Sequence, residues 1–341
     1  MPTLPRSFAL FVGSLWVCAQ ALASEAGWRQ LTLPAADAQT APTVVALYYP
    51  TQAPALTAAM GPFAPRVAIQ ALPEPAFKGL ILLSHGTGGS ELGHTSLAEA
   101  LARHGYLVAA LRHPGDNWQD RSLLQRSPQH YFSERPKQVS RVLDALLRDP
   151  EWKDRIACDA QGPRIGALGH SAGGYTVLAL ASGQPDLARI AQHCQAERAE
   201  DPIFCGMGAP APAGGVAAPT PPAVPVLRDA RVRAVVAMAP LGAAFTAASL
   251  AAIRVPTRVY EAEQDRFLVP RFHAEWIAAN APAAELRRIA GAGHFAFMDR
   301  PGMPIGSPDG DIGADPLGFD RPALLQRLTQ ELPAFFDQAW R

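Results

Sequence analysis

The stretch IGALGHSAG at positions 165–173 contains the pattern G-x-S-x-G, centred on Ser171, directly after a short apolar run. From Gly174 onward the sequence predicts a helix. A sharp strand-to-helix turn needs glycines on both sides of the serine, because its backbone is strained and its neighbours must pack without side chains. Such a serine projects its hydroxyl above the sheet, beside helix-start N–H groups that can bind an anion. We therefore predict that Ser171 is a nucleophile.

Short apolar runs recur on both sides of this turn and predict a sheet that is buried on both faces. Helical patterns lie between them, as expected for parallel strands joined by crossover helices. We therefore predict an α/β fold in one domain, with a mostly parallel, doubly wound sheet flanked by helices. The predicted strands cover residues 44–49, 79–84, 106–111, 165–168, 232–238, 257–260 and 286–289.

The clearest helical pattern covers residues 136–148, where apolar side chains make one stripe that is expected to face the sheet. Residues 96–104 and 270–279 are also predicted helices. Asp320 is predicted to cap a final amphipathic helix. The first stripe consists of Val139, Val142, Leu143, Leu146 and Leu147, and the final helix carries Leu324, Leu325 and Leu328.

A glycine-rich turn, SHGTGGS at 84–90, follows the strand predicted at 79–84. In hydrolytic sites built around a G-x-S-x-G serine, one oxyanion donor comes from a loop after an early strand, and the other from the residue after the nucleophile. Here these donors would be the backbone N–H groups of Thr87 and Ala172. The alternative is a phosphate-binding loop, which is disfavoured because G-x-x-x-x-G-K-[ST] is absent and the turn has no lysine.

His294 and Asp265 are the predicted partners of Ser171. His294 follows the strand predicted at 286–289, and Asp265 lies just beyond the strand predicted at 257–260. A serine hydroxyl needs a base to take its proton, and the base needs a carboxylate that fixes its tautomer and stabilises its cation. The chain order serine, aspartate, histidine fits this assignment.

The carboxylate has two alternatives. Asp265 could instead cap the helix that follows it, and Asp299 is a rival because it lies five residues after His294. We favour Asp265 as the partner of His294, because Asp299 is off the strand-end position that the chain order requires. His85 and His170 are interpreted as structural residues beside the site, since the chemically active histidine of such sites comes late in the chain.

Four segments carry a family resemblance: HGTGGS at 85–90, LAEALARHGYLVAALRHPGDN at 97–117, GHSAGGYTV at 169–177 and GAGHF at 291–295. Together they resemble the bacterial predicted dienelactone hydrolases, which are related to plasma-type platelet-activating-factor acetylhydrolases. The resemblance implies an α/β-hydrolase fold, ester hydrolysis, no cofactor, and the same triad and oxyanion positions. True dienelactone hydrolases use a cysteine nucleophile, whereas this chain has Ser171. The resemblance therefore says little about the substrate.

The charge balance excludes several classes of partner. The chain has 30 Lys+Arg against 30 Asp+Glu residues, so its formal net charge is +0. Nucleic-acid binding by bulk electrostatics needs a basic excess, and anchoring on an acidic membrane surface needs a polybasic segment, and the chain has neither. An apolar fraction of 48% also argues against a disordered chain. The neutral charge favours a neutral small-molecule or polymeric ester as the substrate.

Residues 1–23 have the pattern of a secretory signal peptide. They combine Arg6, an apolar run at 8–17 and the small-x-small end Ala21-Leu22-Ala23, so cleavage is expected after Ala23. A membrane anchor is disfavoured, because the run falls short of the roughly 20 apolar residues that a spanning helix needs. We expect residues 24–341 to form the catalytic domain of a secreted or periplasmic protein.

Removing the signal would leave Cys158, Cys194 and Cys205 in an oxidising compartment, where one disulfide is expected. Cys194 and Cys205 are close in sequence and flank a polar stretch at 195–202 that is predicted to be a loop, so we predict that they pair. Cys158 lies just before a predicted buried strand and is expected to be a lone small apolar side chain. No CxxC pair and no His-x-x-x-His spacing is present, so a zinc site is not expected.

The segment at 206–227 is dense in Gly, Pro and Ala and cannot form a regular element. We predict a surface insertion next to the disulfide, with a lid near the ligand site as the alternative.

Aromatic side chains are candidates for a substrate pocket, with simple packing as the alternative. They are Trp118, Tyr131, Phe132 and Phe295. A cluster of Asp309, Asp311 and Asp315 lacks the D-x-[DN]-x-[DN]-G order of a calcium loop, so a solvated loop is favoured.

Taken together, the sequence predicts an exported serine hydrolase that cleaves carboxylic esters through an acyl-enzyme intermediate. An amidase or peptidase that uses the same triad is the alternative within hydrolases, although no gating domain is evident. A catalytically silent binding module is the alternative from another class, and it is disfavoured because all three triad residues are present.

Overall fold

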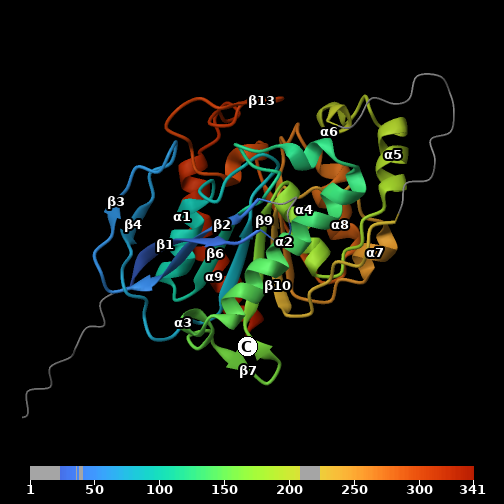
Figure 1. The fold of residues 1–341 in the computed structure, drawn as a ribbon. Helices are drawn as coiled ribbons and strands as arrows, with labels where there is room; N and C mark the ends of the chain where they lie inside the picture. The colour runs from blue at the N-terminus through green and yellow to red at the C-terminus, as the bar shows by residue number, and fades with distance from the viewer. Residues whose placement is uncertain (1–23, 36, 38–40, 208–222) are drawn as a thin grey trace, which may run out of the picture.

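A ten-stranded sheet forms the centre of the protein (Figure 1). The computed structural model describes residues 24–35, 37, 41–207 and 223–341. The strand order is β12 (Ala284–Ile289), β11 (Thr257–Ala262), β10 (Val232–Met238), β9 (Ile165–His170), β5 (Leu80–Ser84), β6 (Leu107–Arg112), β2 (Thr43–Thr51), β1 (Glu25–Leu33), β4 (Arg66–Ile69) and β3 (Leu56–Thr57). The strands from β12 to β6 are parallel, and β2 runs antiparallel to both of its neighbours. The predicted α/β fold with a mostly parallel sheet is confirmed.

The parallel part of the sheet is built from the apolar runs in the sequence. Every predicted strand is present, and its ends lie within two residues of the predicted ones. The central strands β5 and β9 are buried at every residue, because helices cover both faces. Burial on both faces is the reason that these strands are continuously apolar.

The strand β1 is not predicted, because it lacks a continuous apolar run. Most of its residues are half-exposed or exposed. It forms instead by pairing antiparallel with β2 along its whole length, with Trp28 opposite Tyr48. The long-range partner, and not the local sequence, therefore makes this segment a strand.

Helices form one layer on each face of the sheet. The helices α2 (Pro128–Arg148) and α4 (Ala172–Leu180) pack on one face, and α1 (Thr95–Arg103) and α9 (Arg321–Ala339) pack on the other. Figure 1 shows α2 crossing in front of the sheet, with α9 behind it. This arrangement is the predicted doubly wound one.

The helix α2 begins eight residues earlier than the sequence pattern predicts. The side chain of Ser127 accepts a hydrogen bond from the His130 N–H (3.3 Å), and Pro128 occupies the first turn. This cap starts the helix, and Pro136 lies inside it. The predicted stripe holds, since Val139, Val142, Leu143 and Leu146 are fully buried.

The final helix and the predicted helix at 270–279 also have identifiable ends. Asp320 caps α9 by accepting from the Ala323 N–H (3.0 Å), as predicted. The segment at 270–279 is divided into η2 (Pro270–Phe272) and α8 (Ala274–Asn280), because His273 between them has non-helical backbone angles.

The remaining elements are short and connect the larger ones. They are η1 (Ser122–Gln125), α3 (Pro150–Lys153), β7 (Cys158–Asp159), β8 (Gly162–Pro163), α5 (Leu187–Ala196), α6 (Pro202–Gly206), α7 (Ala247–Ala251), η3 (His294–Phe297), β13 (Gly306–Ser307) and β14 (Gly310–Asp311).

The predicted disulfide between Cys194 and Cys205 is present. It joins α5 to α6. The loop predicted at 195–202 is shorter than expected, because α5 continues to Ala196 and α6 begins at Pro202. Cys158 is unpaired, as expected, but it does not pack as a small apolar side chain. Its side chain is exposed and unpaired, because it begins the β7–β8 hairpin, which turns outward before β9 enters the core.

Two predicted segments lie partly or wholly outside the described residues. They are the signal peptide at 1–23 and most of the insertion at 206–227. The described end of the insertion packs on the protein, since Val224 and Leu227 are buried. Over the part of the chain that the structure describes, no helix is long and apolar enough to span a bilayer.

The neighbouring strands β5 and β9 form the point where the winding of the sheet reverses. The chain leaves β5 through α1 to reach β6 on one side, and it leaves β6 through α2 to reach β9 on the other side of β5. Loops separate at the carboxyl ends of strands at such a point and leave room for a ligand. The turn at 84–90 and the Ser171 turn follow these two strands, so the topology places them side by side.

Four histidines at this edge of the sheet are buried: His85, His94, His113 and His170. Burial disfavours the cation and lowers the pKa of His85 and of His94 to about 4. It lowers the pKa of His113 and of His170 well below the usual range. All four are therefore neutral in the folded protein at neutral pH.

Acid should destabilise the fold through these histidines. Their pKa values are lower in the folded protein than in the unfolded chain, so between pH of about 6.5 and about 4 the unfolded chain binds more protons and stability falls as the pH falls. His94 is the best test, because neither of its ring nitrogens has a hydrogen-bond partner among the described residues. We expect His94→Phe to lose less stability on acidification than the wild type, as measured by urea midpoints across this range.

Buried Asp299 contributes to stability with the opposite pH dependence, because burial raises its pKa to about 6. This contribution is the same in the wild type and in His94→Phe, so it cancels when the two proteins are compared. If stability depends on pH equally in the wild type and in His94→Phe, then His94 takes up its proton in the folded protein as readily as in the unfolded chain, contrary to this account.

Candidate active site

Ser171 lies between β9 and α4 in a strained backbone conformation. Its φ is 57° and its ψ is −120°, a combination that residues with a side chain rarely adopt. The close approach of α4 to the sheet explains the flanking glycines. A Cβ on Gly173 would lie 1.9 Å from the carbonyl oxygen of Ser84, and a Cβ on Gly169 would lie 2.1 Å from the carbonyl oxygen of Gly173. Only glycine fits at either position.

The strained residue is held by hydrogen bonds on both sides. The Ser171 N–H donates to the carbonyl of Met238 (3.0 Å), and the Leu241 N–H donates to the carbonyl of Ser171 (3.1 Å). Both partners come from the end of β10 and the residues that follow it. The neighbouring strand therefore supplies part of the restraint that keeps this conformation.

The predicted carboxylate and histidine are hydrogen-bonded. Asp265 Oδ2 lies 2.7 Å from His294 Nδ1, and both side chains are buried. The other oxygen of Asp265 accepts from the N–H groups of Phe267 (2.8 Å) and Leu268 (2.7 Å). Asp265 does not cap the following helix, since η2 (Pro270–Phe272) begins later and has no side-chain cap. Instead one oxygen fixes the turn after β11 and the other holds the imidazole.

The rival carboxylate Asp299 has another partner. It accepts from the Ser96 N–H (2.9 Å) in the first turn of α1. The choice of Asp265 over Asp299 as the partner of His294 agrees with this geometry.

His294 is packed against the residue that precedes the serine. The ring of His170 lies 4.9 Å from that of His294, and His170 Nε2 donates to the His294 carbonyl (2.9 Å). Phe267 stacks on the other side of the imidazole at 4.8 Å. His170 thus joins the serine turn to the histidine turn across 124 residues of chain, in line with its predicted structural role.

The glycine-rich turn at 84–90 lies against the serine. A Cβ on Gly86 would be 3.1 Å from Ser171 Cβ. His85 stabilises the turn from below, since its Nδ1 donates to the Gly86 carbonyl (2.6 Å) and its Nε2 accepts from the His113 N–H (3.1 Å). The two predicted structural histidines therefore hold the two turns that carry the predicted chemistry.

A buried ion pair that sequence reasoning missed fixes the same turn. Asp116 Oδ1 accepts from the Gly88 N–H (2.8 Å), and Asp116 Oδ2 pairs with Arg135, whose side chain is fully buried. Arg135 also donates to the carbonyl of His85. Asp116 lies in the GDN end of the segment quoted for the family resemblance. Arg135 lies one residue before the helix predicted at 136–148 and continues its apolar stripe, four residues before Val139, so a charged residue in line with the buried face was the available signal.

The four candidate pocket aromatics separate into two groups. Tyr131 and Phe132 are buried in α2, and the Tyr131 hydroxyl bonds Thr87 Oγ1 (2.8 Å) and Asp116 Oδ2 (3.0 Å). Their burial and their contacts agree with the packing alternative. The side chain of Trp118 is 60% exposed, and its backbone N–H donates to the Gly89 carbonyl (3.1 Å), which places the residue beside the turn. Phe295 is half-buried and its ring lies 5.0 Å from that of His294.

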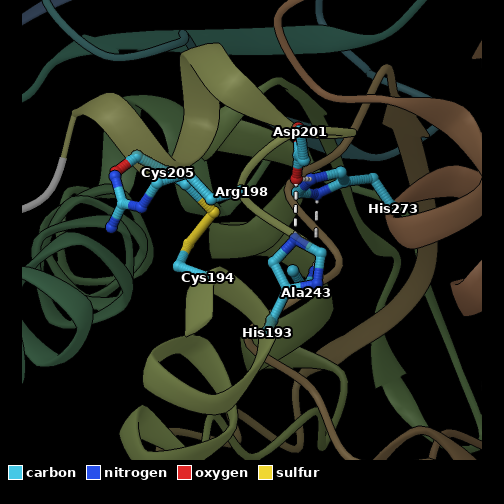
Figure 2. The surroundings of a disulfide bond; sticks show 7 residues. All are labelled: His193, Cys194, Arg198, Asp201, Cys205, Ala243 and His273. Carbon is cyan, nitrogen blue, oxygen red and sulfur yellow. Dashed lines mark hydrogen bonds and ion pairs between the residues drawn. A yellow bond between two sulfur atoms is a disulfide. The ribbon is translucent and has the colours of Figure 1, made fainter. Parts of the chain in front are cut away.

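Two clusters of possible metal ligands lie among the described residues. One cluster joins His193, Asp201 and His273, and is called the Asp201 cluster below; the other combines His193 with the two sulfurs of the disulfide. Oxidised sulfurs are not thiolate ligands. In the Asp201 cluster, Asp201 Oδ2 accepts from Nε2 of His193 (2.8 Å) and from Nε2 of His273 (3.0 Å) (Figure 2).

The tautomer of His273 argues against a metal in the Asp201 cluster. The Gly242 N–H donates to His273 Nδ1 (3.0 Å), so Nδ1 carries the lone pair and the proton is on Nε2, directed at Asp201. Burial lowers the pKa of His273, which keeps the ring neutral. A metal on Nε2 would have to displace that proton, so the cluster is a hydrogen-bonded one.

The acidic residues of the predicted solvated loop have protein partners. Asp311 accepts from the N–H groups of Ile305 and Gly313 (2.9 and 3.0 Å), and Asp315 pairs with Arg300 and Arg321.

A cavity of about 240 Å³ lies beside Leu180 and Val232, at the amino end of β10 and so at the opposite edge of the sheet from Ser171.

Comparisons with known proteins agree on the fold. The solved structure titled "Ferulic acid esterase from Streptomyces cinnamoneus" superposes with a TM-score of 0.59 at 20% identity, covering 94% of this chain and 92% of that one. "Cutinase est1" of Thermobifida alba is 33% identical over 109 residues, which are 32% of this chain and 32% of that protein. "Cutinase 2" of Thermobifida cellulosilytica is 29% identical over 109 residues, 32% of this chain and 36% of that protein. The matched segment thus spans about a third of these relatives.

A family model described as "Alpha/beta hydrolase family" matches residues 80–303. The narrower resemblance to dienelactone hydrolases is not tested by these matches and stays a prediction. The matched region runs from β5, before the glycine-rich turn, to beyond His294, and it includes both the Ser171 turn and the Asp265–His294 pair. The chain therefore belongs to the alpha/beta hydrolase family.

Proposed function

We propose that the protein is a serine hydrolase that cleaves carboxylic esters, with Ser171 as nucleophile, His294 as base and Asp265 as the residue that orients the base. The observation that carries the proposal is the 2.7 Å contact between Asp265 Oδ2 and His294 Nδ1, together with the bond from His170 to the His294 carbonyl, which joins this pair to the serine on its strained strand-to-helix turn. A contact at Nδ1 leaves Nε2 of the imidazole free to accept a proton from a hydroxyl.

The reaction begins when Ser171 Oγ attacks the ester carbonyl carbon and His294 takes the hydroxyl proton. The tetrahedral intermediate collapses by breaking the bond to the alcohol oxygen, which leaves with the proton from His294. Water then attacks the acyl-enzyme, with His294 again as base, and the acid is released while Ser171 regains its proton. Asp265 stabilises the imidazolium that forms in each half of the cycle.

Two backbone amides are proposed to bind the oxyanion. Ala172 is the first residue of α4, so its N–H has no acceptor within that helix. Thr87 lies in the turn beside Ser171, and its neighbours Gly88 and Gly89 use their own N–H groups to hold the turn, bonding Asp116 and the Gly86 carbonyl. Fixed donors at this position stabilise developing charge at no cost in reorganisation.

The substrate class follows from two sources. The similar proteins are named as a cutinase and a ferulic acid esterase, both esterases. The net charge of +0 gives no general attraction for ionic substrates. We propose a neutral small-molecule or polymeric ester.

We also propose that the protein is exported, with the pattern at 1–23 as its signal and residues 24–341 as one catalytic domain, because a disulfide between Cys194 and Cys205 suits an oxidising compartment.

The amidase alternative uses the same residues and is distinguished by kinetics on a matched ester and anilide. A preference for the anilide would replace the ester assignment. A silent binding module would not react with a fluorophosphonate probe.

Replacement of the nucleophile tests the assignment. Ser171→Ala should lower kcat on p-nitrophenyl butyrate by about 10³-fold or more, because the acyl-enzyme can no longer form. KM and the urea midpoint should change little, since alanine is smaller and the turn is kept by its backbone bonds. Turnover by Ser171→Ala close to that of the wild type would refute the proposal.

The support of the oxyanion turn gives a second test. Tyr131→Phe removes the hydroxyl that bonds Thr87 and Asp116 without leaving a buried charge, so the Thr87 amide should be held less firmly. We expect kcat to fall by about tenfold, with KM changed less than twofold.

Tyr175→Phe is the matched control for Tyr131→Phe. It also removes a buried tyrosine hydroxyl, but that hydroxyl donates to the Phe132 carbonyl and not to the turn. Both variants should lose a similar stability of about 1 kcal/mol, and only Tyr131→Phe should lose kcat. Equal kcat values would show that Tyr131 does not support the turn.

A further inference from the structure

The Asp201 cluster lies in a segment that the disulfide closes. Asp201 immediately precedes α6, and its carbonyl accepts from the N–H of Cys205 (3.1 Å). Its own N–H donates to the Glu197 carbonyl (2.9 Å) just after α5. Cys194 on α5 completes the closure, and Figure 2 shows the disulfide beside the two histidines that point toward Asp201. The position of the Asp201 carboxylate is therefore fixed by a short, cross-linked loop.

From Asp201 the contacts continue through His273 to the loop after β10, residues 239–246. His273 Nε2 donates to Asp201, and His273 Nδ1 accepts from the N–H of Gly242 (3.0 Å). The loop lies directly against residue 273, because a Cβ on Gly242 would be 2.4 Å from the His273 carbonyl oxygen. The side chain and the backbone of His273 thus fix the same point of the loop.

The loop after β10 in turn restrains the serine. Leu241, one residue before Gly242, donates to the Ser171 carbonyl (3.1 Å), and Met238 at the end of β10 accepts from the Ser171 N–H (3.0 Å). A conformation such as that of Ser171 costs about 1–3 kcal/mol and persists only where its surroundings hold it. A shift of the loop would therefore reach the serine through its carbonyl.

We propose that Asp201 and His273 are positioning residues for Ser171: they hold the loop after β10 in the place where Leu241 restrains the serine, and the Cys194–Cys205 disulfide fixes Asp201 for this role. The proposal rests on the proposed function, because it assigns the residues an effect on the rate of a serine-dependent reaction. Neither residue touches the substrate, and neither supplies a metal.

Two substitutions of His273 separate positioning from simple packing. His273→Asn keeps an acceptor at the place of Nδ1, since the side-chain oxygen of asparagine lies the same number of bonds from Cβ, and it loses the contact with Asp201. His273→Phe keeps a ring and has neither an acceptor nor a donor. Active sites are counted with a fluorophosphonate probe, and kcat is expressed per labelled serine, so that misfolded protein does not contribute.

We expect kcat per labelled serine to fall by about 10- to 100-fold in His273→Phe, with KM changed less than twofold, because a misplaced nucleophile loses orientation and not ground-state binding. His273→Asn should recover only part of the loss, because it keeps the acceptor for the Gly242 N–H and loses the contact with Asp201. If His273 only stabilises the fold, both variants will have lower urea midpoints and fewer labelled sites, but an unchanged kcat per labelled serine, and the proposal is refuted.

The contribution of the disulfide is measured by non-additivity. Cys194→Ala combined with Cys205→Ala should lower kcat per labelled serine in the wild type by a smaller factor than His273→Phe does, and should have no further effect in the His273→Phe background. If the loss in the combined variant equals the product of the two separate losses, the disulfide does not act through Asp201 and His273.

A readout without catalysis keeps this proposal separate from the proposed function. Amide hydrogen exchange at residues 238–243, measured in the Ser171→Ala background, should be faster in His273→Phe than in His273→Asn. Faster exchange with no esterase activity in the wild type would refute the function and keep the link between His273 and the loop. Unchanged exchange would refute the link.

Discussion

The close approach of α4 to the sheet is the constraint on which the rest of the site depends. Gly173 allows the first turn of the helix to touch the carbonyl of Ser84 at the end of β5, and Gly169 allows the turn to fold back on itself. This contact joins the two central strands at the point where the winding reverses. It forces Ser171 into a strained conformation and brings it next to the glycine-rich turn, so one steric fit sets both the nucleophile and its neighbour.

A strained turn needs restraint from several directions, and the structure supplies it with buried polar groups. The pair of Asp116 and Arg135 fixes the turn after β5. His170 joins the serine turn to His294, and the end of β10 bonds Ser171 on both sides. Such groups are costly to bury and are stable only when paired. The stability of this edge of the fold and the geometry of the site therefore depend on the same contacts.

Much of the fold and of the site could be predicted, because both follow from local patterns. Each parallel strand is an apolar run, and Ser171, Asp265 and His294 each follow such a run. Residues whose importance comes from distant partners were missed. Arg135 lies just before the helix predicted at 136–148, in line with its apolar stripe, and Asp201 resembles any loop aspartate. Cys158 was expected to be a lone small apolar side chain because it precedes β9, whereas it is exposed in the β7–β8 hairpin.

By itself, the sequence determined the order of the parallel strands and of the main helices between them, the serine on its glycine-flanked turn, the pairing of Cys194 with Cys205 and the choice of Asp265, because each is marked by local spacing or by position after a strand. Only the tertiary structure decided how these parts are held, through bonds between residues as far apart as His170 and His294, or Asp201 and His273. Such bonds form only after the chain has closed around the sheet, so no local pattern selects for them. The physical reason is that the strained backbone conformation lies at one residue, Ser171, whereas the hydrogen bonds that maintain it come from residues that only the tertiary fold brings near.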